Sequence, residues 1–230
     1  QRQRVTRSCR SLDGVRESLG KHAVKSEHVN RLRAMVELAA SEAGVAVRPE
    51  ELDADPWALN VLNGTLDLRT GRLRPHRRAD LLTKLAPVEY DPDARAPTWE
   101  TFLSRVVPDE LERAFLRRAI GYTLTGCTDE QCLFLVWGGG ANGKTTFLES
   151  GRRACGDYAM HTPADTLLAI RDTGVPNDVA RLRGARFVTA VETEESRRLA
   201  ESRVKELTGG DTISARFMRG EWFEFRPVAK

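Results

Sequence analysis

The glycine-rich stretch at residues 138–145 has the residue types and the spacing of a loop that binds phosphate. It reads Gly-Gly-Gly-Ala-Asn-Gly-Lys-Thr and fits the pattern G-x-x-x-x-G-K-[ST]. In such a loop, backbone N–H groups and the N-terminus of the following helix converge on an anion. The ammonium group of Lys144 can face the β- and γ-phosphates, and the hydroxyl group of Thr145 can bind magnesium. The predicted nucleotide-binding residues are Gly138, Gly139, Gly140, Ala141, Asn142, Gly143, Lys144, Thr145 and Thr146.

The segments on either side of this loop favour the same interpretation. Residues 132–137 read Cys-Leu-Phe-Leu-Val-Trp and predict a buried strand. Residues 146–149 predict the first turn of a helix. The alternative is a chance match in a glycine-rich turn, and the flanking strand and helix argue against it.

A carboxylate that completes the magnesium shell and positions a water is needed if the bound nucleotide is to be hydrolysed. Glu192 directly follows the apolar segment 185–191, which predicts a second strand. Glu194 lies two residues further and could share the orientation of Glu192 if the strand persists. A surface acidic turn before a helix near Ser196 is the alternative. The catalytic candidates are thus Lys144, Glu192 and Glu194, and the candidate magnesium ligands are Thr145 and Glu192.

The elements upstream of the loop are expected to form a separate, mostly helical region with short hairpins. Apolar residues recur at helical spacing over 5–43, with Gly44 as a candidate C-cap. Over 58–75, short extended pieces are separated by Asn63-Gly64 and Thr70-Gly71, which predicts small hairpins. Two prolines make 91–97 a loop. One helix is then expected from Trp99, capped by Thr98, and another over 109–121, with Leu111, Phe115, Leu116 and Ile120 on one face.

The region downstream of the loop is expected to alternate strand, helix, loop and strand. Residues 211–227 alternate like a hairpin, with Ile213, Ala215 and Phe217 on one face and the turn at 218–220. The second arm carries three aromatic residues that could stack on bases, although alternating aromatics in a hairpin more often pack against the core. They are Trp222, Phe223 and Phe225.

Composition limits the class of protein more than its function. The hydrophobic share of 40% and the charged share of 30% are typical of a globular protein with a core. No apolar run reaches the ~20 residues that cross a bilayer, and the N-terminus lacks the apolar stretch of a signal peptide. The four scattered cysteines favour a reducing cytoplasm, and buried thiols are preferred over a zinc site at Cys127 and Cys132. Basic residues concentrate in 1–33, where a phosphate-contacting arm and a solvated helical face both remain open.

Three segments, in this order, resemble the superfamily 3 helicases. They are the phosphate loop 138–146, the strand that ends in residues 192–195, and residues 205–217, which read Lys-Glu-Leu-Thr-Gly-Gly-Asp-Thr-Ile-Ser-Ala-Arg-Phe. The helicase portion of phage and plasmid primase-helicases, related to the poxvirus primase-helicase, is the most similar. Residues 53–68 and 119–126 resemble the domain that precedes the helicase core in those proteins. The resemblance covers roughly residues 46–230 and leaves 1–45 as a basic helical segment or linker.

The resemblance implies an α/β fold of the P-loop NTPase type, similar to AAA+ proteins, in residues 126–230, preceded by a smaller domain at 46–125. It also implies ATP and Mg²⁺ as cofactors, a ring-shaped oligomer, commonly a hexamer, and translocation on single-stranded DNA during replication of a mobile element in a bacterial cytoplasm. Glu192 would activate water, and the hairpin turn would reach DNA through Arg219. Lys205 and Arg216 match basic positions of the same motif.

Two elements of the helicase family are expected beyond this sequence: a polar sensor after the next strand and an arginine finger. The first residue is Gln1, so the chain is expected to be part of a longer protein or a processed product. The resemblance implies that the longer protein also carries a primase domain. We therefore expect residues 1–230 alone to bind ATP but to hydrolyse it poorly. The competing functions are a DNA-binding or loading module switched by nucleotide without turnover, and a small-molecule P-loop kinase, for which residues 205–226 have no evident role.

Overall fold

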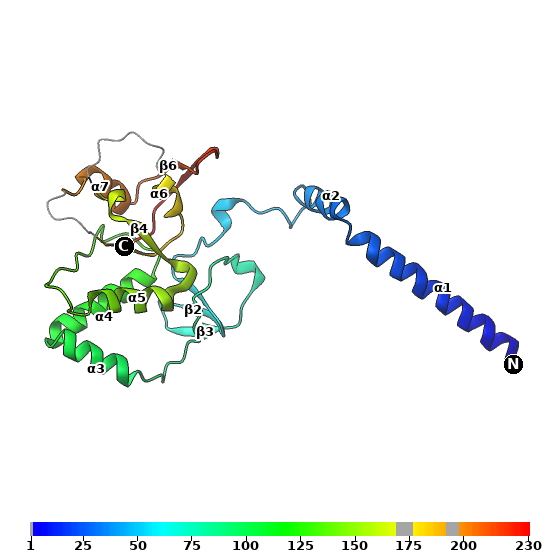
Figure 1. Ribbon diagram of the computed structural model, residues 1–230, viewed down its shortest axis with the longest axis horizontal. Coiled ribbons are helices and arrows are strands. Elements are labelled where there is room, and N and C mark those ends of the chain that lie inside the picture. Colours follow the sequence, from blue (N-terminus) through cyan, green and yellow to red (C-terminus); the bar gives the residue numbers. More distant parts are fainter. Residues whose placement is uncertain (1, 169–176, 192–197) are drawn as a thin grey trace. The chain divides into compact units, whose positions relative to one another are not determined.

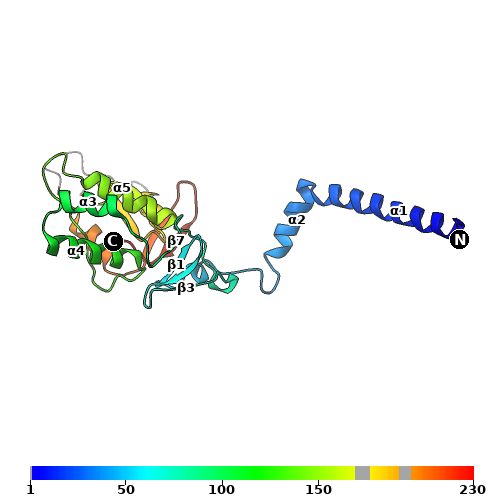
Figure 2. The same ribbon diagram turned by 90° about the horizontal axis from the view of Figure 1, so that it is seen from below.

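The computed structural model describes residues 2–168, 177–191 and 198–230, with side chains from residue 14 onward. Contacts divide the chain into two compact units, Gln1–Glu51 and Leu52–Lys230. Each unit is described by itself below (Figures 1 and 2). The domain limits expected at residues 45 and 126 remain predictions.

The first unit contains two α-helices rather than the single helix expected over 5–43. Helix α1 spans Arg2–Ser26 and α2 spans Val29–Ala39, followed by a 3₁₀ turn at Pro49–Glu51. The break occurs because His28 has an extended backbone and caps α2, its ring accepting a hydrogen bond from the Asn30 N–H. Gly44 lies beyond the end of α2 with a φ of 77°, in a turn, so its expected role as the C-cap was wrong.

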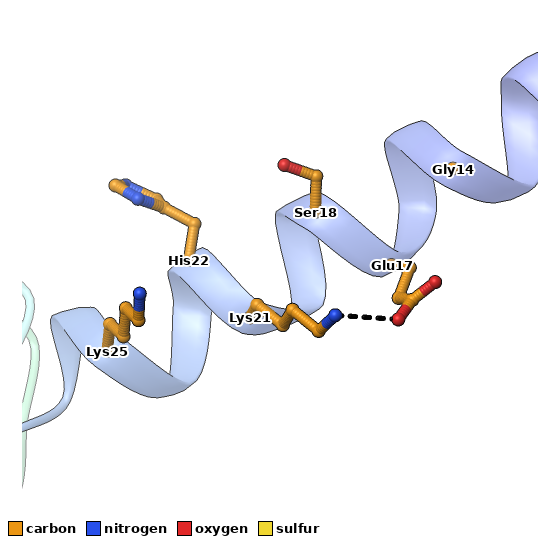
Figure 3. A pocket seen from close by; sticks show the side chains of 6 residues that line it. All are labelled: Gly14, Glu17, Ser18, Lys21, His22 and Lys25. Carbon is orange, nitrogen blue, oxygen red and sulfur yellow. Dashed lines mark hydrogen bonds and ion pairs between the residues drawn. The ribbon is translucent and has the colours of Figure 1, made fainter.

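Apolar side chains of this unit remain exposed. No residue of α2 is buried, and Leu32, Met35 and Val36 are exposed there. A polar face of α1 is shown in Figure 3, where Lys21 forms an ion pair with Glu17 at 2.7 Å. A single helix supplies all the residues that line this shallow hollow, so it does not enclose a ligand site. They are Gly14, Glu17, Ser18, Lys21, His22 and Lys25.

The second unit begins with a three-stranded antiparallel sheet, as the hairpin signals predicted. Its strands are β1 (Ala58–Val61), β2 (Gly64–Asp67) and β3 (Arg72–Arg74), in the order β1-β2-β3. Val61 pairs with Gly64 across the first turn, and Asp67 pairs with Arg72 across the second. A 3₁₀ turn follows at Arg78–Asp80. The turn residues Asn63-Gly64 and Thr70-Gly71 therefore separate strands as expected.

Helices α3 (Pro97–Val106) and α4 (Glu110–Leu124) follow the sheet. Helix α3 starts at Pro97 rather than after a Thr98 cap, because proline has no N–H to leave unpaired at the first helical position. Asp109 caps α4 by accepting a hydrogen bond from the Glu112 N–H at 3.0 Å. The apolar face expected on α4 is only partly buried: Ile120 packs against the core, whereas Leu111 is 80% exposed.

The second unit also contains a parallel pair of strands. Helix α5 (Lys144–Cys155) leads through a 3₁₀ turn at Gly156–Tyr158 into β4 (Ala159–Pro163), which pairs in parallel with β5 (Phe187–Val191). Along the chain, a 3₁₀ turn (Ala164–Thr166) and α6 (Asn177–Arg181) come between β4 and β5. The strand predicted over 185–191 is thus confirmed.

The chain returns to this sheet at its last residue. The Lys230 N–H donates to the Arg186 carbonyl at 3.0 Å, and the Val188 N–H donates to the Lys230 carbonyl at 3.2 Å. These two bonds on either side of Phe187 are the pattern of parallel pairing. Residue 230 therefore lies beside β5.

The hairpin near the end of the chain matches its prediction. Helix α7 spans Glu201–Thr208, and β6 (Ile213–Arg216) pairs antiparallel with β7 (Trp222–Phe225) around the turn at 218–220. Figure 1 shows this hairpin in orange to red.

Two clusters of buried side chains lie within the second unit. One joins the three-stranded sheet to α5 and β5, and the other joins α6 and α7 to the hairpin. The first contains Leu59, Val61, Leu66, Ala86, Cys155, Tyr158 and Phe187, and the second contains Val179, Ala180, Leu182, Leu207, Ile213, Ala215 and Phe225.

The buried strand predicted over 132–137 was wrong. These residues form no strand, and Leu135 and Trp137 are 75% and 94% exposed. A strand requires a neighbour for its backbone hydrogen bonds, and no segment among the described ranges pairs with 132–137. The architecture shown is a mixed α/β fold with small sheets. No helix in the described part of the chain has the length and apolar character needed to span a membrane.

Candidate nucleotide-binding site

The loop of residues 138–143 ends in the N-terminus of α5. Ala141 and Gly143 adopt left-handed φ values of 55° and 82°, and Gly143 is the N-cap residue of the helix. No side chain caps this helix, and its first turn carries no acidic residue. Free N–H groups at the first turn give a helix N-terminus partial positive charge, so it is suited to an anion.

Lys144 is held inside the loop by three oxygen atoms. Its ammonium group donates to the carbonyl groups of Gly138 and Gly139 at 2.7 and 2.9 Å, and to Oδ1 of Asn142 at 2.8 Å. These bonds use all three donors of the ammonium group. The structure thus brings the charge of Lys144 to the loop, while Thr145 and Thr146 are exposed in the first turn of α5.

Helix α3 packs behind the loop, which the sequence did not predict. A Cβ atom placed on Gly143 would lie 2.8 Å from Cγ1 of Val106 and 3.2 Å from the Phe102 ring. Trp99 extends the contact along α5, because its ring stacks on Phe147 with centroids 5.8 Å apart. The close approach and the positive φ both require glycine at position 143.

Helix α5 is fixed against the parallel strands. A Cβ atom on Gly151 would lie 2.8 Å from the Phe187 ring, so the helix lies close to the start of β5. The chain passes from the end of α5 to the start of β4 within Gly156–Tyr158, and β4 runs parallel to β5. The N-terminus of α5 therefore points toward the carboxyl ends of both strands.

The carboxylate expected to activate water lies outside the described residues. Both Glu192 and Glu194 fall in the range 192–197. Strand β5 ends at Val191, so the chain enters this range at the strand end toward which the phosphate loop is directed. The roles assigned to Glu192 and Glu194 remain predictions.

The three basic residues expected to bind DNA lie on two elements. Lys205 is exposed on α7. Arg216 ends β6, and Arg219 stands in the hairpin turn with a φ of 61°. The hairpin thus carries both Arg216 and Arg219, and Lys205 is on a separate element.

The cysteines and the hairpin aromatics differ in how deeply they are buried. Cys155 is buried, and burial raises the pKa of its thiol to about 11, whereas Cys127 and Cys132 are half-buried. Among the hairpin aromatics, Phe225 packs in the core at 7% exposure, as expected, but Trp222 is 58% exposed.

Residues 3–108 match the family described as D5 N terminal like. Over 187 residues the chain is 28% identical to a provisionally named helicase of Acanthamoeba polyphaga mimivirus. It is 28% identical over 189 residues to a provisionally named primase of African swine fever virus, isolate Tick/Malawi/Lil 20-1/1983, and 27% identical over 190 residues to a provisionally named helicase of Invertebrate iridescent virus 3. The chain is homologous to viral primase and helicase proteins. The resemblance found in the sequence is therefore confirmed.

The matches cover only part of each relative. Each covers 78% of this chain but 19% or 20% of the relative, so the chain spans about a fifth of the length of these proteins. The family match starts at residue 3, so it includes most of the segment 1–45 that the sequence reasoning left outside the resemblance. The relatives come from viruses and lend no support to the expected phage, plasmid or bacterial origin.

Proposed function

We propose that this chain is the ATP-binding part of a replicative primase-helicase, which couples ATP hydrolysis to translocation on single-stranded DNA. In this proposal, residues from about 126 onward form a P-loop NTPase core of the AAA+-like type. The intact protein would carry a primase domain and assemble as a ring, commonly a hexamer. The names of the viral relatives support the role in replication.

The observation that carries the proposal is the position of Lys144. It stands at the uncapped N-terminus of α5, within a loop that has left-handed residues at 141 and 143. This terminus is directed toward the carboxyl end of β5, where a ligand-binding crevice forms in open parallel sheets. The donor set fits a nucleotide with magnesium, since backbone N–H groups and an ammonium group suit phosphate and the Thr145 hydroxyl suits Mg²⁺.

The chain's own residues would divide the work of hydrolysis. Lys144 would exchange its bonds to loop carbonyls for bonds to the β- and γ-phosphates. Glu192 would orient the attacking water and accept its proton. Magnesium, when bound, would neutralise charge that develops on the phosphates. The hairpin with Arg216 and Arg219 would grip the DNA backbone, which requires cations rather than base-reading groups.

A second candidate function is a nucleotide-switched DNA-binding module without efficient turnover. The hydrogen bonds of Lys144 to its own loop favour this alternative. They define an arrangement of the loop that ATP binding would replace. ATP binding that changes DNA affinity, with no hydrolysis by the full-length protein, would select this alternative.

The proposal is tested by comparing the chain with its Lys144→Ala variant in a titration with a fluorescent ATP analogue and Mg²⁺. We expect binding to be lost in the variant while the thermal unfolding midpoint changes little, because Lys144 bonds only within the loop. Lys205→Ala is the control, since it removes an exposed lysine from a separate helix. Equal ATP affinity in the Lys144→Ala variant would refute the nucleotide site.

A further inference from the structure

The two faces of the β6–β7 hairpin have different environments. Ile213 pairs with Phe225 and Ala215 pairs with Phe223, and this face enters the core cluster of α6 and α7. Side chains alternate along a strand, so the intervening pairs occupy the opposite face. Those pairs are Ser214 with Glu224 and Arg216 with Trp222.

Trp222 lies on this outer face and does not belong to the core cluster. It is 58% exposed, although it lies in a regular strand pair. The guanidinium carbon of Arg216 lies 4.9 Å from the centre of its ring. A cation over an indole ring holds the ring in place, and the exposed part of Trp222 can contact another planar group.

Charges around Trp222 favour an anionic partner on the side of the turn. Arg216 contacts the ring, and Arg219 stands three residues before it in the turn, exposed. The turn itself is anchored, because the Met218 N–H donates to Oδ1 of Asn177 at 3.3 Å. Within residues 213–225 the acidic groups are Glu221, beside the turn, and Glu224, two residues from Trp222 along the same face. Two arginines and one carboxylate at the turn end of the hairpin leave that end positively charged, which favours a phosphate there.

We infer that Trp222 is a stacking platform for one nucleobase of single-stranded nucleic acid, with Arg216 and Arg219 binding the adjoining phosphates. This inference rests on the proposed DNA-translocating function and adds a contact with a base. Base–aromatic stacking tolerates any sequence, since every base has a π face. A flat aromatic next to cations fits a nucleobase with its phosphate better than an apolar protein surface.

The test uses fluorescence anisotropy of the 230-residue chain with a labelled oligo(dT) strand and with an abasic strand of equal length and charge. Trp222→Ala should weaken oligo(dT) binding about 5- to 150-fold, which corresponds to a stacking loss of ~1–3 kcal/mol. Trp222→Phe should stay within about threefold of the wild type, because phenylalanine keeps an aromatic face. The wild type should bind the abasic strand no better than Trp222→Ala binds oligo(dT).

Matched variants separate stacking from charge and from unfolding. Trp137→Ala removes a tryptophan that is 94% exposed outside the hairpin, and its DNA affinity should equal that of the wild type. Arg219→Ala should lower the salt dependence of binding by up to ~0.7 in log K against log salt, whereas Trp222→Ala should leave the slope unchanged.

Several outcomes would overturn the inference. They are equal affinity of Trp222→Ala and the wild type, equal loss in Trp137→Ala, or a change in oligomeric state on loss of Trp222 with DNA affinity retained. A wild type that binds ATP but no single-stranded DNA would also overturn it, while leaving the nucleotide site at Lys144 intact. Loss of ATP binding with the Trp222 effect retained would instead indicate failure of the nucleotide site alone.

Discussion

Arg186 is buried at the start of β5, and its guanidinium group joins three parts of the second unit. It donates to the carbonyl groups of Leu124 at 2.8 Å and Ala58 at 3.0 Å, and it lies 4.7 Å from the centre of the Tyr158 ring. Burial lowers the pKa of Arg186, yet an arginine remains protonated in proteins. The end of α4 and the start of β1 are thereby tied to the strand that leads toward Glu192.

Arg186→Ala should lower the free energy of unfolding by about 2–4 kcal/mol, because several buried carbonyl groups would lose a charged donor. Urea unfolding followed by circular dichroism measures this change. Arg72→Ala is the matched control, as it removes an exposed arginine from β3 and should shift stability by less than ~0.5 kcal/mol. A loss below ~1 kcal/mol in Arg186→Ala would show that the buried guanidinium does not hold these elements together.

Sequence reasoning at the residue scale succeeded where the chemistry is local. Lys144 bonds to atoms at positions 138, 139 and 142, all within one motif, so the pattern was sufficient to place it. Arg186 bonds to residues 62 and 128 positions away, and no local pattern predicts such partners. Trp222 was expected to pack inward because aromatics in a hairpin usually do, but strand alternation places it on the outer face.

Helix α3 is the element that connects the region before the loop to the predicted phosphate-binding site. Val106 and Phe102 lie against Gly143, and Trp99 stacks on Phe147 of α5. A helix whose N-cap and first turn pack against a neighbouring helix presents its N–H groups in a fixed direction. We therefore assign α3 a positioning role for nucleotide binding, with no contact to the nucleotide itself.

Phe102→Ala should weaken ATP binding about tenfold, equivalent to ~1.4 kcal/mol, because the loop loses its support at Gly143. A fluorescent-nucleotide titration measures the dissociation constant, and Phe102→Leu should restore most of the affinity by refilling the space. Leu111→Ala is the control, since it removes an apolar side chain of α4 that is 80% exposed. Unchanged ATP affinity in Phe102→Ala would exclude the positioning role of this helix.

Elements whose partners are close in sequence were predicted well. The hairpins at 58–74 and 213–225 pair with their own neighbours, and turn residues mark them. Residues 132–137 have the apolar content of a strand but find no partner in the described ranges, so pattern alone gave the wrong element. The packing of α3 on Gly143 was missed because periodicity identifies a buried face without identifying what covers it.

The whole chain divides into two compact units between residues 51 and 52. Both clusters of buried side chains lie within residues 52–230, together with the phosphate loop and the hairpin. The first unit has exposed apolar residues on α2 and no buried ones there. The free energy that keeps the second unit folded therefore arises from contacts inside that unit.

A chain of residues 52–230 should consequently fold without the first 51 residues. Its thermal unfolding midpoint should lie within ~4 °C of that of the 230-residue chain, since a change of ~1 kcal/mol moves a protein of this size by about that amount. Circular dichroism measures the midpoint, and ATP binding should be retained because α3, α5 and the loop are all present. An unfolded product, or a midpoint lowered by more than ~10 °C, would mean that residues 1–51 complete the core of the second unit. A lower DNA affinity with an unchanged midpoint would instead show that the basic N-terminal segment binds DNA phosphates. Its nine Lys and Arg residues within positions 1–33 would supply the positive charge for such contacts.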